Sequence, residues 1–305
     1  MKKGIMLVVI LSMVFSLIGC SSGSEEVKAK QVSILTPYLS SVTTNQMVET
    51  MKKGIEEKGW IANVVDTKGD FAQLASRMED VISSKTNAIV IVSTDPNQVI
   101  AQIAKADEEG IPVFGCDSGF IDGMTLNATS DNSVMSEMIT QYLFDEMGGK
   151  GKLIVLSHRP HPGVLMRTEK LDEMLKNYPG IEVITEQHVE VPGPIENSRK
   201  VMENLILANT ETDSITAVWC GWDEPAIGVS QALNDAGRTN VIVTGIDGNS
   251  QAVEMINSGS TLKATVSQNF DGMAEIVVGE MEKVFNGETI DKGDRYAPAT
   301  LITKK

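Results

Sequence analysis

The amino-acid sequence predicts an α/β protein of two Rossmann-like lobes, each with a parallel sheet. Strand-like and helix-like segments alternate from about residue 32 to residue 250, which is typical of parallel sheets with helices on both faces. The length of 305 residues is enough for two domains. Residues 113–117 (VFGCD) and 243–247 (VTGID) share the pattern V-x-G-x-D, a faint internal repeat in which each strand ends in aspartate.

The first unit is expected over residues 32–120. Asp95, Pro96 and Gln98 form a helix start with an N-cap, a proline at the first helical position and a glutamine at the third. Gly110 ends that helix. The expected strands are 32–35, 61–66, 88–92 and 113–116, and the helices begin near Thr44, Phe71 and Pro96.

The second unit is expected over residues 152–250, preceded by a helix over residues 131–147. Its expected strands are 153–156, 183–187, 217–220 and 241–246. Its expected helices cover residues 167–177 and 198–207 and begin again at Asp223 and Ser250.

The N-terminus has the features of an export signal. Lys2 and Lys3 precede an apolar run over residues 5–18, and small polar residues follow from Ser21. The run is shorter than the ~20 residues that a spanning helix needs. We expect residues 1–19 to be removed, and residues 20–30 to form a flexible polar tether.

The charge and the cysteines narrow the function classes. The net charge is −15, and loss of the two lysines with residues 1–19 makes it more negative. Such a surface repels phosphate backbones and anionic lipids, so nucleic-acid binding is disfavoured. The sequence does not decide whether Cys116 and Cys220 form a disulfide, although two unpaired buried thiols fit the apolar strand ends better.

Polar residues at the carboxyl ends of the predicted strands are the candidates for ligand binding, because ligands of open parallel sheets bind at those ends. They are Thr94, Asp95, Asp117, Ser118, Ser157, His158, Trp222, Asp223, Asp247 and Gln268. Two lobes that face each other would hold a ligand in the cleft between them.

Several segments in a fixed order resemble one family. They are residues 51–54 (MKKG), 110–113 (GIPV), 116–119 (CDSG), 130–132 (SDN), 148–152 (GGKGK), 201–205 (VMENL) and 245–248 (GIDG). In these the chain resembles the type I solute-binding proteins of ABC sugar importers, in particular the ribose-binding family. Residues 17–20 (LIGC) resemble a bacterial lipobox, which implies lipidation at Cys20; an ordinary secretory signal is the alternative.

The resemblance implies the type I periplasmic binding protein fold, with a three-segment hinge. We place its crossings near Ser130, near Gln268 and at residues 294–298. The expected lobes are residues 31–130 with 269–294, and residues 131–268 with 295–305. The implied mechanism is hinge closure on a solute, after which ABC permease subunits recognise the closed form.

The family's binding positions fall on Asn45, Asp117, Arg167, Asp247 and Gln268. Carboxylates accept, guanidinium donates and amides do both, as sugar hydroxyls require. Adding strand-end candidates, we expect these ligand-binding residues: Asn45, Asp117, Ser118, His158, Arg167, Trp222, Asp247 and Gln268.

The chain also departs from the family. Met47 and Val48 stand where the family has two phenylalanines against the sugar ring, and Ser118 replaces an arginine. Trp222 stands where the family has asparagine. We therefore expect the stacking surface in the second lobe and a solute other than ribose, most simply another sugar or polyol.

Parts of the sequence are also compatible with two other function classes. Asp117 and Asp247 would suit an exported carbohydrate-active enzyme, as a general acid and base, but export and the family likeness favour binding without catalysis. His158 and His161 lack further ligands for a metal, so we expect no metal and no cofactor. A sensor that docks on a signalling receptor remains an alternative to an importer component. We expect a monomer, held at the outer face of the membrane by lipid on Cys20.

Overall fold

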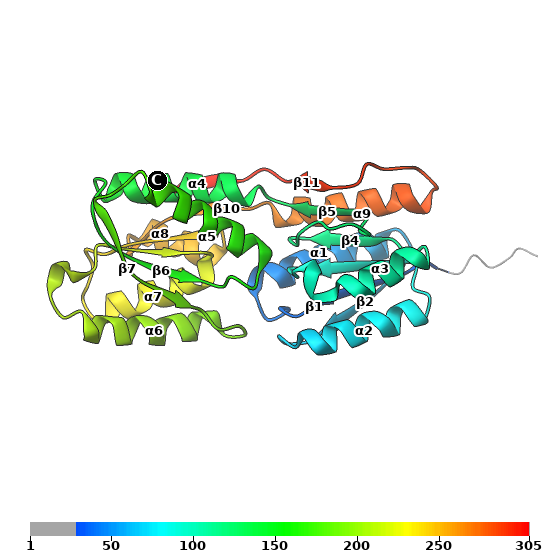
Figure 1. The fold of residues 1–305 in the computed structure, drawn as a ribbon, viewed down its shortest axis with the longest axis horizontal. Coiled ribbons are helices and arrows are strands. Elements are labelled where there is room, and N and C mark those ends of the chain that lie inside the picture. The colour runs from blue at the N-terminus through cyan, green and yellow to red at the C-terminus, as the bar shows by residue number, and fades with distance from the viewer. Residues whose placement is uncertain (1–28, 305) are drawn as a thin grey trace, which may run out of the picture.

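The structure, a computed structural model, describes residues 29–304. Two lobes lie end to end, and each contains a six-stranded sheet flanked by helices (Figure 1). This confirms the predicted α/β class with two parallel-sheet lobes. The expected signal segment, Cys20 and most of the tether lie outside the described residues. In the described part of the chain, no helix is both long enough and apolar enough to cross a membrane.

The first sheet has the strand order β11-β5-β4-β3-β1-β2, and every pairing in it is parallel. Its strands are β1 (Gln31–Thr36), β2 (Ile61–Asp66), β3 (Ala88–Val92), β4 (Val113–Cys116), β5 (Leu126–Thr129) and β11 (Asp294–Tyr296). Its helices are α1 (Val42–Glu57), α2 (Phe71–Ser83), α3 (Ile100–Glu108) and α9 (Phe270–Phe285), with a 3-10 turn at Pro96–Val99.

The second sheet has the order β12-β10-β9-β8-β6-β7, and only β12 runs antiparallel to its neighbour. Its strands are β6 (Gly151–Ser157), β7 (Ile181–His188), β8 (Ala217–Cys220), β9 (Ile242–Asp247), β10 (Leu262–Ser267) and β12 (Thr300–Thr303). Its helices are α4 (Asn132–Glu146), α5 (Pro162–Leu175), α6 (Pro194–Ala208), α7 (Asp223–Asp235) and α8 (Ser250–Ser258).

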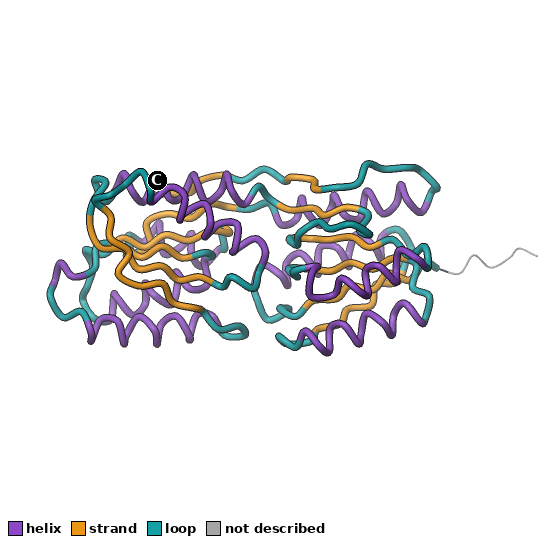
Figure 2. Tube along the Cα trace, viewed as in Figure 1, coloured by secondary structure: helices purple, strands orange, loops and turns teal. Residues whose placement is uncertain are grey.

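Each sheet buries both of its faces under helices (Figure 2). Along β6, Leu153 and Val155 join the core under α4 and α5, whereas Ile154 and Leu156 join the core under α6, α7 and α8. The alternation follows from the two-residue period of a strand. Because both faces are buried, the strands read as nearly continuous apolar runs, which made them recognisable in the sequence.

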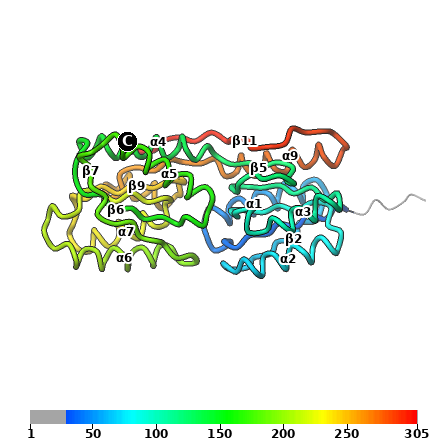
Figure 3. The backbone as a smooth tube through the Cα atoms, in the orientation of Figure 1, coloured from blue at the N-terminus to red at the C-terminus, as the bar shows by residue number. Residues whose placement is uncertain are grey.

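The chain passes between the lobes three times, as Figure 3 traces. It crosses from β5 to α4, from β10 to α9, and from β11 to β12. These are the places expected near Ser130, near Gln268 and at residues 294–298. The third crossing starts later than the expected lobe boundary at residue 294, because Arg295 and Tyr296 still pair with β5 of the first sheet.

Three helix starts differ from the expectations. Helix α5 begins at Pro162, because the ring of His161 caps it by accepting the backbone N–H of Gly163. An imidazole cap is rare, so the pattern of capping residues did not predict it. Helix α6 begins at Pro194, four residues before the expected residue 198, and helix α1 begins at Val42, two residues before the expected Thr44.

Cys116 and Cys220 are free buried thiols. They belong to the cores of different lobes. Burial raises the pKa of both thiols, which favours the unreactive protonated form. The expectation of two unpaired cysteines is confirmed.

Gly228 in α7 offers a test of the helix packing. A Cβ added there would overlap Ile195 O and Ser198 Oγ of α6, whereas one added at Gly279 in α9 meets no atom within 4 Å. We predict that Gly228→Ala lowers the free energy of unfolding by about 1–3 kcal/mol. Gly279→Ala should leave it unchanged or raise it by up to about 1 kcal/mol. Urea denaturation followed by circular dichroism measures both, and equal losses would contradict the packing described.

Candidate functional site

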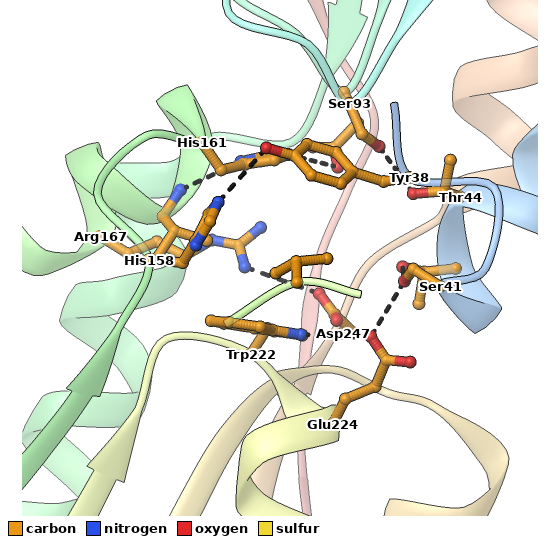
Figure 4. Close-up of a pocket in the computed structure, with 14 residues that line it drawn as sticks. Tyr38, Ser41, Thr44, Ser93, His158, His161, Arg167, Trp222, Glu224 and Asp247 are labelled. Carbon is orange, nitrogen blue, oxygen red and sulfur yellow. Dashed lines mark hydrogen bonds and ion pairs between the residues drawn. The ribbon is translucent and has the colours of Figure 1, made fainter. Parts of the chain in front are cut away.

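A cavity lies between the lobes, at the carboxyl ends of the strands of both sheets (Figure 4). In the first lobe it is lined by Tyr38, Ser41, Thr43, Thr44, Ser93 and Asp117. In the second lobe it is lined by His158, His161, Val164, Arg167, Val191, Trp222, Glu224 and Asp247. Both lobes therefore contribute hydrogen-bonding groups and aromatic rings to one enclosed space.

Three polar residues enter the cavity on sharp backbone turns at strand ends. Ser93 follows β3, Asp117 follows β4 and Asp247 ends β9, and their φ angles are 52°, 50° and 145°. Residues other than glycine rarely adopt positive φ, and such strained positions concentrate at functional sites. The strain here turns a buried strand abruptly so that its last side chain points into the cleft.

Arg167 is held rigidly although it is almost completely buried, with 2% exposure. Its Nε donates to Asn132 Oδ1 at 2.8 Å, and its Nη1 donates to the carbonyl of Gly221 at 2.9 Å. Nη1 also lies 3.6 Å from Asp247 Oδ1. These bonds engage Nε and Nη1, whereas Nη2 forms no hydrogen bond with the described residues, and Arg167 lines the cavity.

Asp117 and Asp247 are buried carboxylates that approach the cavity from opposite lobes. Burial raises the pKa of Asp117 to about 6, partly opposed by Arg167 and by Ser93. Burial also raises the pKa of Asp247, although Arg167 and Gln268 oppose the shift. Asp117 Oδ1 has no hydrogen-bond partner among the described residues. The closed cavity thus holds an acceptor that lacks a donor, which is costly unless a ligand supplies one.

A second layer of polar groups fixes Asp247 and the turn after it. Gln268 Nε2 donates to Asp247 Oδ1 at 2.8 Å. Behind it, Asp223 accepts the hydroxyl of Thr265 at 2.7 Å and the backbone N–H of Asn249 at 2.8 Å. Burial raises the pKa of Asp223 to about 6. Asp223 is not in the cavity lining, so it supports the site from behind.

The two histidines of the cavity have assignable tautomers. His158 Nδ1 lies 3.0 Å from the carbonyl of Val189, so it carries the proton and Nε2 accepts the Tyr38 hydroxyl, 3.3 Å away in the other lobe. His161 Nδ1 accepts backbone N–H groups, so its Nε2 carries the proton, 3.8 Å from Asp117 Oδ2. Burial lowers the pKa of His161 to about 3 and lowers that of His158, so both are neutral.

Glu224 links the two lobes at the other end of the cavity. Its Oε2 accepts the Ser41 hydroxyl at 3.0 Å and the indole N–H of Trp222 at 3.2 Å. Burial raises the pKa of Glu224, opposed by these two donors and by the backbone of Val42. The contact supplies an acceptor to the start of α1, whose own N-cap residue makes no side-chain cap bond.

Five of the residues expected from the sequence lie together in the cavity lining, and three do not. The five are Asp117, His158, Arg167, Trp222 and Asp247. Ser118 faces inward, where its hydroxyl donates to Ile91 O at 3.1 Å and accepts the N–H of Thr94. Gln268 stands behind Asp247. Asn45 is exposed on α1 and outside the cavity lining.

The geometry of helix α1 explains the place of Asn45. Each residue turns a helix by about 100°, so the helix directs Thr44 to the cavity and Asn45 to solvent. Met47 and Val48 are fully buried in the core of the first lobe. The aromatic surface is nevertheless not confined to the second lobe as expected, because Tyr38 of the first lobe lines the cavity too.

Tyr38, Ser93, His161 and Glu224 were not among the expected ligand residues. Tyr38 and Ser93 follow β1 and β3, so the strand-end rule that found Asp117 could also have found them. Glu224 sits in the first turn of α7, directly after the expected Trp222 and Asp223. Within residues 29–304 no cluster of three or more His, Cys, Asp or Glu side chains is placed to hold a metal ion.

Comparisons with known proteins agree with this architecture. The chain is 28% identical to the ribose import binding protein of Bacillus subtilis, over 100% of both chains. It is 26% identical to the D-apiose import binding protein of Actinobacillus succinogenes, over 89% of this chain and 87% of that protein.

Solved structures share the fold. An ABC transporter solute-binding protein of Agrobacterium vitis with bound allitol superposes with a TM-score of 0.86 at 24% identity, over 91% of this chain and 96% of that one. One from Bacillus halodurans with bound myo-inositol gives 0.82 at 24% identity, over 90% and 94%. Residues 32–289 match the periplasmic binding protein domain family. The chain therefore belongs to the periplasmic binding protein domain family, a family of extracytoplasmic solute-binding proteins.

Proposed function

We propose that the protein is the substrate-binding lipoprotein of an ABC importer, and that it captures a sugar or polyol by closing its lobes on it. The observation that carries the proposal is the pair Asp117 and Asp247, which reach one cavity from opposite lobes beside the fixed guanidinium of Arg167. Related proteins named for ribose and D-apiose import support the solute class.

The cavity chemistry suits a polyhydroxylated solute. Asp117 and Asp247 accept hydroxyl protons, while Arg167 Nη2 and His161 Nε2–H donate to hydroxyl oxygens. Tyr38 and Trp222 offer ring surfaces to the C–H faces of a sugar. Strong binding needs both lobes, so a ligand stabilises the closed form, which is the form that the permease recognises in this proposal.

A thermal-shift panel of pentoses, hexoses, polyols and amino compounds tests the proposal on the protein begun at Ser21. A ligand at 100 times its Kd stabilises the folded state by about 2.7 kcal/mol, which raises the melting temperature measurably. A panel in which every sugar and polyol leaves the melting temperature unchanged would refute the solute class.

Arg167→Ala should weaken binding of the selected solute by at least about 30-fold, because truncating a buried charge partner costs 2–5 kcal/mol. The loss leaves Asp247 without its cation. Arg159→Ala is the matched control: Arg159 pairs with Glu186 and Asp172 at the surface, and we expect less than about a twofold change. Titration calorimetry measures both, and similar effects of the two variants would contradict the assigned role of Arg167.

Closure of the empty cleft should depend on pH. Burial in the closed form raises the pKa of Asp117 from 3.8 to about 6, so protonation favours closure and ionisation opposes it. Above pH 6 the opposition is worth roughly 3 kcal/mol, and it fades as the pH falls through 6. We predict a smaller radius of gyration for the unliganded protein at pH 5 than at pH 7.5, measured by small-angle X-ray scattering. Asp117→Asn should remove much of the difference, and a compact empty protein at pH 7.5 would contradict the prediction.

We propose that the acidic protein is held at the outer face of the membrane as a monomer by lipid on Cys20, with residues 21–30 as a tether. Labelled palmitate should enter the wild-type protein, and Cys20→Ala should abolish labelling and release the protein from membranes. Cys116→Ala, which changes a buried thiol, should leave the labelling unchanged. Labelling that survives in Cys20→Ala would disprove the anchor.

A further inference from the structure

The charges that line the cavity do not balance. Three carboxylates, Asp117, Asp247 and Glu224, face one guanidinium, that of Arg167. Both histidines are neutral, because burial lowers their pKa. A neutral sugar supplies no cation, so every ionised carboxyl group beyond the one paired with Arg167 would stay buried and unpaired, which is costly.

The guanidinium of Arg167 acts on the carboxyl groups at one end of the cavity. Arg167 acts on the pKa of Asp117, Asp223 and Asp247. At the other end, the groups that oppose the raised pKa of Glu224 are Ser41, Trp222 and the backbone of Val42, and none of these carries a positive charge. Glu224 is 4% exposed. Glu224 is therefore a buried carboxyl group with no cation among the groups that act on its pKa.

An aromatic ring lies beside that carboxylate. The indole N–H of Trp222 donates to Glu224 Oε2 at 3.2 Å, which fixes the ring against the carboxylate, and Figure 4 shows the two side chains next to one another. Trp222 is 8% exposed and lines the cavity. A carboxylate and the face of an indole ring each attract an ammonium group, and the hydrogen bond at the N–H edge of Trp222 leaves the faces of the ring free of that contact.

The hydrogen-bonding groups of the cavity that still lack partners are also mainly acceptors. Asp117 Oδ1 is buried and unpartnered among the described residues. Glu224 accepts the Ser41 hydroxyl and the Trp222 indole N–H at Oε2 and the backbone of Val42, which does not use all of the about four lone-pair sites of a carboxylate. The donors with fixed direction are Arg167 Nη2 and His161 Nε2–H. An ammonium group donates three hydrogen bonds and accepts none, whereas each hydroxyl also needs a donor.

We propose that the solute is a sugar or polyol bearing a primary amine, with its ammonium at Glu224 and Trp222 and its hydroxyls at Asp117, Asp247 and Arg167. The inference rests on the proposed capture of sugars or polyols and narrows their class. Glu224 thereby acts as a specificity-determining residue in addition to linking the lobes through Ser41.

Matched ligand sets test the inference on the unmodified protein. Titration calorimetry at pH 7 compares 2-amino-2-deoxyhexoses with their parent hexoses and N-acetyl forms, and 1-amino-1-deoxyalditols and inosamines with the parent alditols and inositols. In at least one set we expect the amine to bind about tenfold or more tightly than both neutral counterparts, the size of a hydrogen bond to a charged group.

Glu224→Gln keeps the shape and most hydrogen bonds but removes the charge. It should erase the tenfold preference for the amine, measured within the variant as the ratio of the amine's affinity to that of its neutral counterpart. Glu254→Gln is the control, because Glu254 is an exposed carboxylate of α8 in the same lobe and lines neither this cavity nor the neighbouring pocket that Glu224 also borders. It should keep the preference.

The outcomes separate the two proposals. Sugars or polyols that bind with no amine preference in any set would overturn the amine inference and leave the proposed function standing. An amine preference that persists in Glu224→Gln would overturn the place assigned to the ammonium. Absence of binding by every member of every set would count against sugar or polyol capture itself.

Discussion

The stability of the closed form depends on the protonation and the hydrogen bonding of two buried carboxyl groups. Asp117 and Asp247 stand at strand ends of opposite lobes, and closing the cleft removes both from water. Burial raises the pKa of each, and closure without a ligand leaves Asp117 Oδ1 without a hydrogen-bond donor among the described residues. A solute with several hydroxyls supplies those donors. Ligand binding and lobe closure are thereby coupled, because the buried acceptors need donors that the ligand supplies. Without a ligand, the open form is favoured.

The residues that hold the site also lie at the hinge. Asn132, which fixes Arg167, is the first residue of α4, directly after the first crossing. Gln268, which holds Asp247, lies at the second crossing between β10 and α9. A ligand that engages Arg167 and Asp247 therefore acts on side chains whose partners sit where the lobes pivot. This short connection lets a small molecule bias a large motion.

The periodic strands made the fold and much of the site predictable. Asp117, His158, Trp222 and Asp247 follow buried parallel strands, and the rule that ligands bind at such ends found all of them. Arg167 came from resemblance, since nothing in its local pattern directs it inward. The wrong predictions concern side chains whose direction the local sequence pattern does not fix. Asn45 also came from resemblance, but helix α1 directs it to solvent.

Contacts between the lobes lay beyond sequence reasoning altogether. The contacts of Ser41 with Glu224 and of Tyr38 with His158 join residues more than 100 positions apart. Local sequence patterns do not predict such contacts. Ser118 shows the complementary limit: it stands at a strand end, yet its hydroxyl is used by the backbone of Ile91 and Thr94. Which strand-end side chains face a ligand depends on partners that only the folded chain reveals.

The most direct test of ligand-driven closure is a crystal structure of the protein with the solute that stabilises it most in the thermal-shift panel. The account predicts a solute enclosed by both lobes, with a donor hydrogen-bonded to Asp117 Oδ1 at about 2.5–3.2 Å and a second polar group on Arg167 and Asp247. A solute bound by one lobe alone, or an enclosed solute that leaves Asp117 Oδ1 without a donor, would contradict it.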